Sequence, residues 1–216
     1  MSVQASKTHH GSSIGINPGK GAECEVNNGG CSHLCLTTPL GKKCACPNDY
    51  ELNEENQCVK PAAFLLYVSE GDINRSSLNR ANNNNNGLVL PMTGIAQASA
   101  IDGDFNDRMI YWMDIEEKTI SRGLVNGANR TVVVEFGLDF PEDLAIDRIA
   151  NNLYWTDAGL NRIEVGKVDP NGKLVARRVL IWDNLVRPCS IAVDPRGGMM
   201  FWSTWSKRPV IGKIIF

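Results

Sequence analysis

Leu144-Ala145-Ile146-Asp147 and, after five residues, Leu153-Tyr154-Trp155-Thr156-Asp157 form a pattern that recurs in both directions along the chain. The upstream copies are Ala100-Ile101-Asp102 and Ile110-Tyr111-Trp112-Met113-Asp114, and the downstream copies are Ala192-Val193-Asp194 and Met200-Phe201-Trp202-Ser203-Thr204. The three tryptophans lie 43 and 47 residues apart, and the dipeptides Asn126-Gly127 and Asn171-Gly172 lie 45 residues apart. A period of this length, built from short strands and turns, is typical of four-stranded propeller blades.

The repeat at residues 141–187 indicates how one blade is built. Its alternation of apolar and polar residues predicts strands at 144–147, 153–155, 163–168 and 176–181. The Asn-Gly dipeptides predict tight hairpins in which both central residues have positive φ. We expect each repeated tryptophan to pack between neighbouring sheets, because it is a large apolar side chain that recurs once per blade.

The period places repeats near 64–95, 96–140, 141–187 and 188–216. The first repeat is degenerate, and its run of asparagines at 82–86 predicts an exposed loop. The last repeat stops in what should be a third strand, so we expect an incomplete propeller that exposes an apolar edge. Aligning Tyr67 with Tyr111 and Tyr154 places Glu70 on Asp157, Asn74 on Asn161 and Arg75 on Arg162.

Six of the seven cysteines fall within 35 residues, at Cys24, Cys31, Cys35, Cys44, Cys46 and Cys58. Such density in a stretch that lacks a hydrophobic core indicates a disulfide framework from an oxidising compartment. A zinc site is the alternative, but a Cys-x-Cys pair is poor geometry for one tetrahedral metal. Six cysteines allow fifteen pairings, and the spacing alone leaves them open. We expect the seventh, Cys189, to be a buried thiol.

The cysteine segment resembles an epidermal-growth-factor-like module. The resemblance rests on the spacing Cys24-x6-Cys31-x3-Cys35-x8-Cys44-x-Cys46-x11-Cys58 and on Asn28-Gly29-Gly30 before Cys31. It implies disulfides between Cys24 and Cys35, Cys31 and Cys44, and Cys46 and Cys58. Calcium-binding modules of this kind carry an acidic cluster before the first cysteine. Here Gly19-Lys20-Gly21-Ala22-Glu23 stands in its place, so we expect no metal and no cofactor.

The repeats resemble the Tyr-Trp-Thr-Asp propeller of the low-density lipoprotein receptor family. A cysteine module directly followed by such repeats is most similar to the large receptor-related proteins of the megalin type. The resemblance covers residues 24–216 and implies a mainly β fold: a disulfide-rich module at 23–60 and, at 61–216, roughly three and a half blades of a six-bladed propeller. Residues 1–22 are expected to form a disordered tail. The fourth repeat lacks the motif aspartate, which puts its polar contact between blades in doubt.

The repeated aspartates have two interpretations. We expect Asp114 and Asp157 to accept hydrogen bonds from backbone amides of turns and of the neighbouring blade. We expect Asp102, Asp147 and Asp194 to cap the turns after the inner strands, because aspartate readily bonds the backbone just beyond itself. The alternative is a ring of carboxylates that holds a cation in the axial channel.

Composition and short motifs indicate where the chain works. A net charge of −2 lacks the strong basic footprint of nucleic-acid-binding domains. No apolar run is long enough to span a bilayer, and residues 1–22 lack the apolar core of a signal peptide. The disulfide framework and the glycosylation sequons at Asn74 and Asn129 predict a glycoprotein. The family resemblance implies a place on the extracellular side of the plasma membrane, as part of a larger single-pass receptor.

Three classes of function remain open. The resemblance favours a non-catalytic fragment of an endocytic or signalling receptor, whose partners are extracellular protein ligands together with the missing blades and further modules. The alternative is a nidogen-like extracellular matrix binding protein. A propeller hydrolase is disfavoured, because no histidine lies between residues 34 and 216 and no Ser-His-Asp or Cys-His set can form there. We therefore expect no catalytic residue. We expect ligand contacts at Glu142, Arg187 and Trp205, loop residues too polar or too large for a turn role alone.

Overall fold

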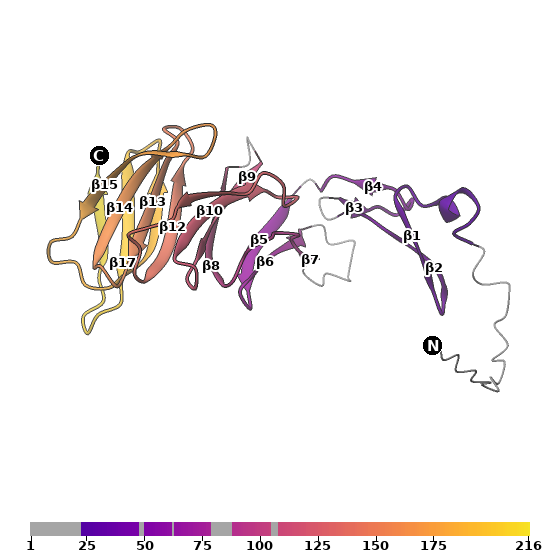
Figure 1. Cartoon of the computed structure of the whole chain (residues 1–216), viewed down its shortest axis with the longest axis horizontal. Helices are drawn as coiled ribbons and strands as arrows, with labels where there is room; N and C mark the ends of the chain where they lie inside the picture. Colours follow the sequence, from indigo (N-terminus) through magenta and orange to yellow (C-terminus); the bar gives the residue numbers. More distant parts are fainter. Residues whose placement is uncertain (1–22, 48–49, 62, 79–87, 105–107) are drawn as a thin grey trace, which may run out of the picture. The chain divides into compact units, whose positions relative to one another are not determined.

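The computed structural model describes residues 23–47, 50–61, 63–78, 88–104 and 108–216. The chain forms two compact units that divide between Lys60 and Pro61, and nearly all of its regular structure is β (Figure 1). The predicted tail at 1–22 and the predicted loop at 82–86 lie outside the described residues. Within those ranges, no helix is long and apolar enough to cross a membrane.

The first unit is a small module with three disulfides. Strand β1 (Leu34–Thr38) pairs with β2 (Gly41–Ala45), and β3 (Glu51–Leu52) pairs with β4 (Cys58–Val59). A short 3-10 turn, η1 (Asn27–Gly30), precedes them. The Cα atoms of each disulfide lie 5.3–5.6 Å apart, and the bonded pairs are Cys24 with Cys35, Cys31 with Cys44, and Cys46 with Cys58. These are the pairs that the family resemblance implies.

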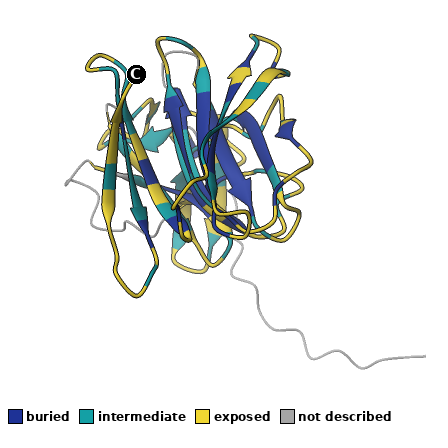
Figure 2. Cartoon of the chain, turned by 90° about the vertical axis from the view of Figure 1, so that its left-hand side faces the viewer, coloured by how far each residue is buried: buried dark blue, intermediate teal, exposed yellow. Residues whose placement is uncertain are grey.

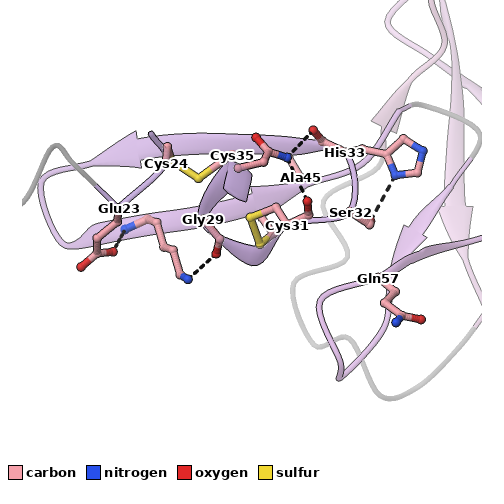
Figure 3. Close-up of a disulfide and its surroundings, with 12 residues drawn as sticks. Glu23, Cys24, Gly29, Cys31, Ser32, His33, Cys35, Ala45 and Gln57 are labelled. Carbon is pink, nitrogen blue, oxygen red and sulfur yellow. Dashed lines mark hydrogen bonds between the residues drawn. A yellow bond between two sulfur atoms is a disulfide. The ribbon is translucent and has the colours of Figure 1, made fainter. Parts of the chain in front are cut away.

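Asn28 and Gly29 of the Asn-Gly-Gly motif are required by the packing of this module. Gly29 has φ +60, and a Cβ atom there would lie 2.8 Å from the Sγ atom of Cys35. Asn28 Nδ2 donates to the carbonyls of Cys31 and His33, at 2.9 and 2.8 Å (Figure 3). The motif therefore fits a backbone turn tightly against the disulfides.

The second unit consists of four antiparallel sheets in chain order, which we call blades 1 to 4. In the residues that the structure describes, they contain three, four, four and three strands, which confirms the predicted propeller of roughly three and a half blades. Blade 1 is β5 (Phe64–Ser69), β6 (Asp72–Ser77) and β7 (Leu88–Val89). Blade 2 is β8 (Ala98–Asp104), β9 (Met109–Asp114), β10 (Thr119–Leu124) and β11 (Thr131–Val134). Blade 3 is β12 (Pro141–Asp147), β13 (Asn152–Asp157), β14 (Arg162–Val168) and β15 (Leu174–Ile181), and blade 4 is β16 (Pro188–Asp194), β17 (Met199–Thr204) and β18 (Ile211–Ile215).

The repeated aromatic residues form the core between blades. Trp112 packs with residues of blades 1 and 2, and Trp155 packs with residues of blades 2 and 3. Each tyrosine that precedes a tryptophan faces the following blade instead, because successive strand residues point to opposite faces. Tyr111 therefore joins the core between blades 2 and 3, and Tyr154 joins the core between blades 3 and 4. Both tryptophans are fully buried, as predicted, and Figure 2 shows the buried residues concentrated in the strands.

Blade 4 exposes one face of its sheet. The side chains of Met200 and Trp202 pack toward blade 3. Ile211 and Ile215 of β18 pair with Ser203 and Met199, so they lie on the opposite face. They are 84% and 66% exposed, which is the apolar exposure that the sequence predicts.

The alignment of the first repeat is wrong by one residue. Leu66 pairs with Arg75 in blade 1, as Tyr111 pairs with Arg122 in blade 2. Leu66 also packs in the core between blades 1 and 2, so Leu66, and not Tyr67, is the equivalent of Tyr111. Tyr67 therefore takes the position of the tryptophan, since a shift of one residue moves a side chain to the other face. The β5–β6 turn is also shorter, because Ser69 already pairs with Asp72. The predicted matches of Asn74 and Arg75 to Asn161 and Arg162 fail for this reason.

The Asn-Gly turns differ from the predicted tight hairpins. Gly127 and Gly172 have φ values of +86 and +89, whereas their asparagine neighbours do not have positive φ. The amide of Gly127 donates to Leu124 O at 2.8 Å, and that of Gly172 donates to Asp169 O at 2.9 Å. Glycine is thus the fourth residue of each turn. Pro170 favours this arrangement, because its ring holds φ near −65°, the value required at the second position.

Replacing Gly127 by alanine is expected to lower the free energy of unfolding by about 2–4 kcal/mol. A Cβ atom there would lie 2.2 Å from the carbonyl oxygen of Pro91, in the linker between blades 1 and 2. Gly198→Ala is the matched control, since Gly198 also has positive φ but has no atom within 4 Å of its added Cβ. It should lose about 1 kcal/mol. Urea unfolding measures both losses, and equal losses would contradict the steric argument.

Candidate functional site

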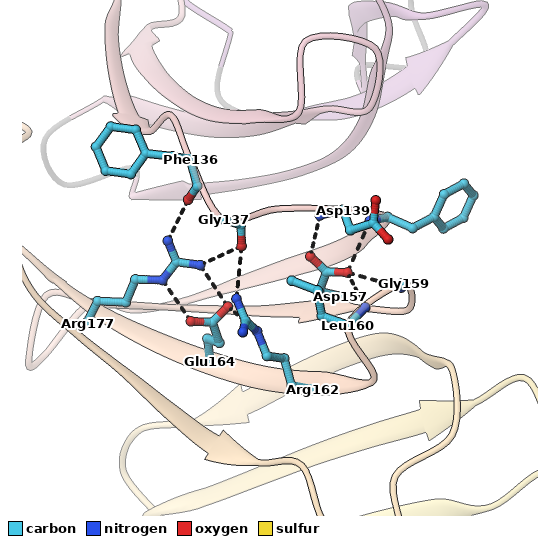
Figure 4. A network of polar contacts seen from close by, with 10 residues as sticks. Phe136, Gly137, Asp139, Asp157, Gly159, Leu160, Arg162, Glu164 and Arg177 are labelled. Carbon is cyan, nitrogen blue, oxygen red and sulfur yellow. Dashed lines mark hydrogen bonds and ion pairs between the residues drawn. The ribbon is translucent and has the colours of Figure 1, made fainter.

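One end of blade 3 is formed by the linker from blade 2 and the β13–β14 turn. Pro141 pairs with Asp157, so the linker at 135–140 lies beside the turn at 158–161. The Asp157 carboxylate is fully buried and joins the two segments. It accepts hydrogen bonds from the amides of Asp139 (2.8 Å), Phe140 (3.1 Å), Gly159 (3.1 Å) and Leu160 (3.0 Å) (Figure 4).

Asp114 does the same in blade 2. Its carboxylate accepts the amides of Ala96 and Gln97 in the linker from blade 1, and those of Glu116 and Glu117 in the β9–β10 turn. These bonds confirm the predicted structural role of the motif aspartates. The aspartates hold each linker against a turn of the blade that it enters.

Blade 4 replaces this contact with another. Thr204 stands where the aspartate is missing, and among the described residues its hydroxyl accepts only the amide of Val210, at 3.2 Å. The amide of Arg187, in the linker from blade 3, donates instead to Asn161 Oδ1 at 2.7 Å. Asn161 belongs to the β13–β14 turn of the preceding blade. The linker from blade 3 to blade 4 therefore keeps a polar contact with a blade, although the acceptor is now Asn161. The missing aspartate in the fourth repeat is the signal in the sequence that another acceptor is needed.

The structure brings the three predicted contact residues to the junction of blades 3 and 4, but Glu142 lies in strand β12 and not in a loop as predicted. Trp205 donates its amide to Arg187 O at 2.8 Å, and Arg187 acts electrostatically on Glu142. Trp205 also donates its indole N–H to Cys189 Sγ at 2.8 Å, yet it remains 64% exposed. Cys189 is half-buried, so the prediction of a buried thiol is wrong. Its sulfur atom lies beside the indole of an exposed loop residue.

Two neighbouring carboxyl groups at this junction have altered acidity. Burial raises the pKa of the Glu142 carboxyl, and the Arg187 guanidinium opposes part of that rise. Burial also raises the pKa of the Asp143 carboxyl, although amides of Ile191 and Leu144 donate to it at 2.9 Å each. The charged form of Asp143 is thus poorly solvated but bonded to the backbone.

The prediction for the inner-strand aspartates is partly wrong. Asp147 accepts the amides of Ile149 and Ala150, and Asp194 accepts those of Arg196 and Gly197, so both cap turns as predicted. Asp102 does not cap a turn. It pairs with Tyr111, as Ala145 pairs with Tyr154 in blade 3, so Asp102 corresponds to Ala145 and not to Asp147. Asp104 ends the strand in its place. A shift of two residues leaves each side chain on the same face, so alternation cannot detect it.

Asp102 instead joins neighbouring inner strands. One of its carboxylate oxygens accepts the amide of Ile146 in blade 3 at 2.9 Å, as Asp143 accepts the amide of Ile191 in blade 4. Both aspartates line a groove of about 690 Å³ along the inner strands. In the described ranges, no group of three or more His, Cys, Asp or Glu residues is arranged to hold a metal ion.

A buried charged triad fastens blade 3 to the linker from blade 2. Glu164 is 2% exposed and accepts Arg162 Nε at 2.9 Å, Arg177 Nε at 2.7 Å and Arg177 Nη2 at 2.8 Å. Arg162 and Arg177 also donate to Gly137 O, at 3.0 and 2.9 Å, and Arg177 donates to Phe136 O at 2.6 Å (Figure 4). The sequence pattern does not predict this triad. Alternation places Glu164 among the polar positions of its strand but does not reveal its burial.

The two glycosylation sequons differ in accessibility. Asn74 is 7% exposed, and its Nδ2 atom, the atom that a glycan modifies, donates to Asp72 O at 3.1 Å. Asn129 is exposed between β10 and β11. We propose Asn129 as the glycosylated residue, because the folded chain covers Asn74.

Asn129→Gln is expected to abolish the gel-mobility shift that enzymatic removal of N-linked glycans produces in the secreted chain. Asn74→Gln is the matched control and should keep the full shift, since the folded chain leaves no room for a glycan on the buried Asn74 side chain. Electrophoresis before and after deglycosylation checks both variants. A shift that persists in Asn129→Gln and disappears in Asn74→Gln would reverse the assignment.

Comparison with known families matches both units. Residues 108–148 and 151–195 match "Low-density lipoprotein receptor repeat class B", and residues 24–58 match "Coagulation Factor Xa inhibitory site". Low-density lipoprotein receptor-related protein 5 of Mus musculus and that of Homo sapiens are each 46% identical to the chain over 135 residues. The match covers 62% of this chain and 8% of each relative.

Solved structures resemble the blades. A nidogen/laminin complex aligns at 32% identity with a TM-score of 0.61, over 69% of this chain and 56% of the matched chain. A gluconolactonase from Xanthomonas campestris aligns at 21% identity with a TM-score of 0.52, over 65% of this chain and 52% of its own. The second likeness concerns the fold alone.

Proposed function

Because this chain carries low-density lipoprotein receptor class B repeats behind an epidermal-growth-factor-like module, we propose that it is a non-catalytic part of an extracellular endocytic or signalling receptor. It binds protein ligands through the loop end of blades 3 and 4. The receptor relatives and the nidogen likeness support an extracellular binding module. The three disulfides support an oxidising location outside the cytosol.

The observation that carries this proposal is the exposed but fixed side chain of Trp205. Its indole is 64% exposed, although its backbone and ring nitrogens both have acceptors. Arg187, to which it is bonded, has φ +47, a strained conformation for a residue other than glycine. Tryptophan and arginine are the residues most enriched at the energetic centres of protein interfaces. An indole held in this way loses little conformational entropy when a ligand binds.

A nidogen-like matrix function is the second candidate, supported by the 32% identity to the nidogen/laminin structure. Purified laminin distinguishes the two candidates. Laminin binding that Trp205→Ala weakens would favour the matrix function.

A hydrolase function has less support. The gluconolactonase likeness carries the fold only, at 21% identity. The chain has no histidine after His33, so the propeller unit offers no imidazole base.

Trp205→Ala is expected to weaken ligand binding about 30-fold, the effect of removing a central interface residue. The ligands are peptides selected from a random phage-displayed library on the whole secreted chain. Arg187→Ala should weaken the same peptides several-fold, and Glu142→Ala should change their affinity because it removes the carboxylate on which Arg187 acts. Trp182→Ala is the matched control, because Trp182 is 66% exposed but belongs to the other end of its linker. Peptides that respond to Trp182→Ala and to none of the other three would overturn the proposed surface.

A further inference from the structure

The blade 4 loop surface, which we define as Val186, Arg187, Trp205, Lys207 and Arg208, combines apolar and basic side chains. All five are exposed, and Val186 and Trp205 are 53% and 64% exposed. They come from the linker before β16 and from the β17–β18 turn. The amide of Trp205 donates to Arg187 O, so the two segments lie side by side. This surface therefore forms one continuous face rather than two separate loops.

The β17–β18 turn is held in one conformation by its own hydrogen bonds. The hydroxyl of Ser206 donates to Arg208 O at 2.5 Å and accepts the amide of Arg208 at 3.2 Å. At the base of the turn, Thr204 and Val210 bond to each other through both amides, at 3.1 and 3.2 Å. The basic side chains thus project from a fixed backbone, which reduces the entropy lost on binding.

The positive charge of this surface is only partly neutralised. Glu142 is the carboxylate on which Arg187 acts. Among the described residues, neither Lys207 nor Arg208 forms an ion pair. In blade 2, by contrast, Lys118 at the corresponding turn pairs with Asp139 at 3.1 Å. An approaching ligand with negative charge therefore finds complementary charge at blade 4 and not at blade 2.

We propose that the blade 4 loop surface binds an acidic peptide segment that carries an apolar side chain. This inference rests on the proposed function and names the chemistry of its ligand. The apolar side chain packs on Trp205 and Val186, and the carboxylates face Arg187, Lys207 and Arg208. A sulfated glycan fits less well, because it offers nothing apolar to Val186 and Trp205, and Glu142 repels a dense polyanion beside Arg187.

The test is the net charge of peptides selected on the whole chain from the random library used above. Peptides that lose at least 10-fold affinity with Trp205→Ala are expected to be net negative and to contain an apolar residue. Raising the salt concentration from 50 to 500 mM should weaken them several-fold, since salt screens exposed charges. Selection on the triple variant Arg187→Glu, Lys207→Glu, Arg208→Glu should yield net positive peptides.

Other results would contradict the proposed acidic ligand. Trp205-dependent peptides that are neutral or positive would overturn this inference and leave the proposed function standing. An absence of peptides that depend on Glu142, Arg187 or Trp205 would overturn both, and peptides that depend on Arg187 but not on Trp205 would overturn this inference alone. Chain retention on immobilised heparin that the triple variant Arg187→Glu, Lys207→Glu, Arg208→Glu abolishes and Trp205→Ala leaves intact would identify a sulfated glycan as the ligand and would also overturn the inference. Trp182→Ala must leave the selected charge unchanged, because it tests whether any exposed tryptophan produces the same result.

Discussion

Asp157→Ala is expected to lower the free energy of unfolding of the propeller unit by about 3–5 kcal/mol, one of the two largest losses that we predict. The carboxylate is fully buried and accepts four backbone amides from two segments. Each buried amide left without an acceptor costs about 1–3 kcal/mol, but partial relaxation makes the costs less than additive. All five tryptophans lie in the propeller unit, so tryptophan fluorescence during urea unfolding follows this unit alone.

Thr204→Ala provides the matched control at the equivalent position of blade 4. Thr204 is also buried, but its hydroxyl accepts a single amide, from Val210. Its replacement should lose about 1 kcal/mol. Equal losses in the two variants would contradict the prediction. They would show that a blade is not stabilised by the bonds that its motif aspartate makes to the linker and the turn.

Glu164→Ala is expected to lower the free energy of unfolding by about 3–5 kcal/mol, because it leaves two arginines without their carboxylate. Arg162 and Arg177 are only 26% and 23% exposed, so water replaces the lost partner poorly. The guanidinium of Arg177 also lies over the Trp155 ring, 5.1 Å from its centroid. Urea unfolding followed by fluorescence measures this loss as well.

Two controls separate the buried triad from ordinary surface charge. Lys118→Ala breaks the exposed pair with Asp139 and should cost less than about 1 kcal/mol. The double variant Glu164→Ala, Arg177→Ala should be less destabilised than the sum of its single variants, since removing one arginine relieves an unpaired charge. Additive losses in this cycle would show that Glu164 and Arg177 act independently.

Local patterns along the chain are sufficient to predict much of this protein. The spacing of the tryptophans predicts the blades, because a large apolar residue that recurs once per repeat has to be buried in each one. The cysteine spacing predicts the disulfide module. The aspartate after each Tyr-Trp pair predicts a cap for nearby backbone amides. Each of these features depends on residues that are close in sequence or that repeat at a regular interval.

The register of the strands depends on contacts between strands. The meeting of side chains that are distant in sequence depends on contacts between blades. Alternation cannot detect the shift that separates Asp102 from Asp104, and similarity of single residues cannot show that Tyr67 occupies a tryptophan position. The burial of Glu164 follows from Arg177, 13 residues away, and from the carbonyls of a linker that reaches it from another blade. The junction of Glu142, Arg187 and Trp205 likewise exists only where blades 3 and 4 pack together. The burial and the contacts of such polar side chains depend on partners that are distant in sequence. The apolar period of a blade, in contrast, can be recognised from the local sequence.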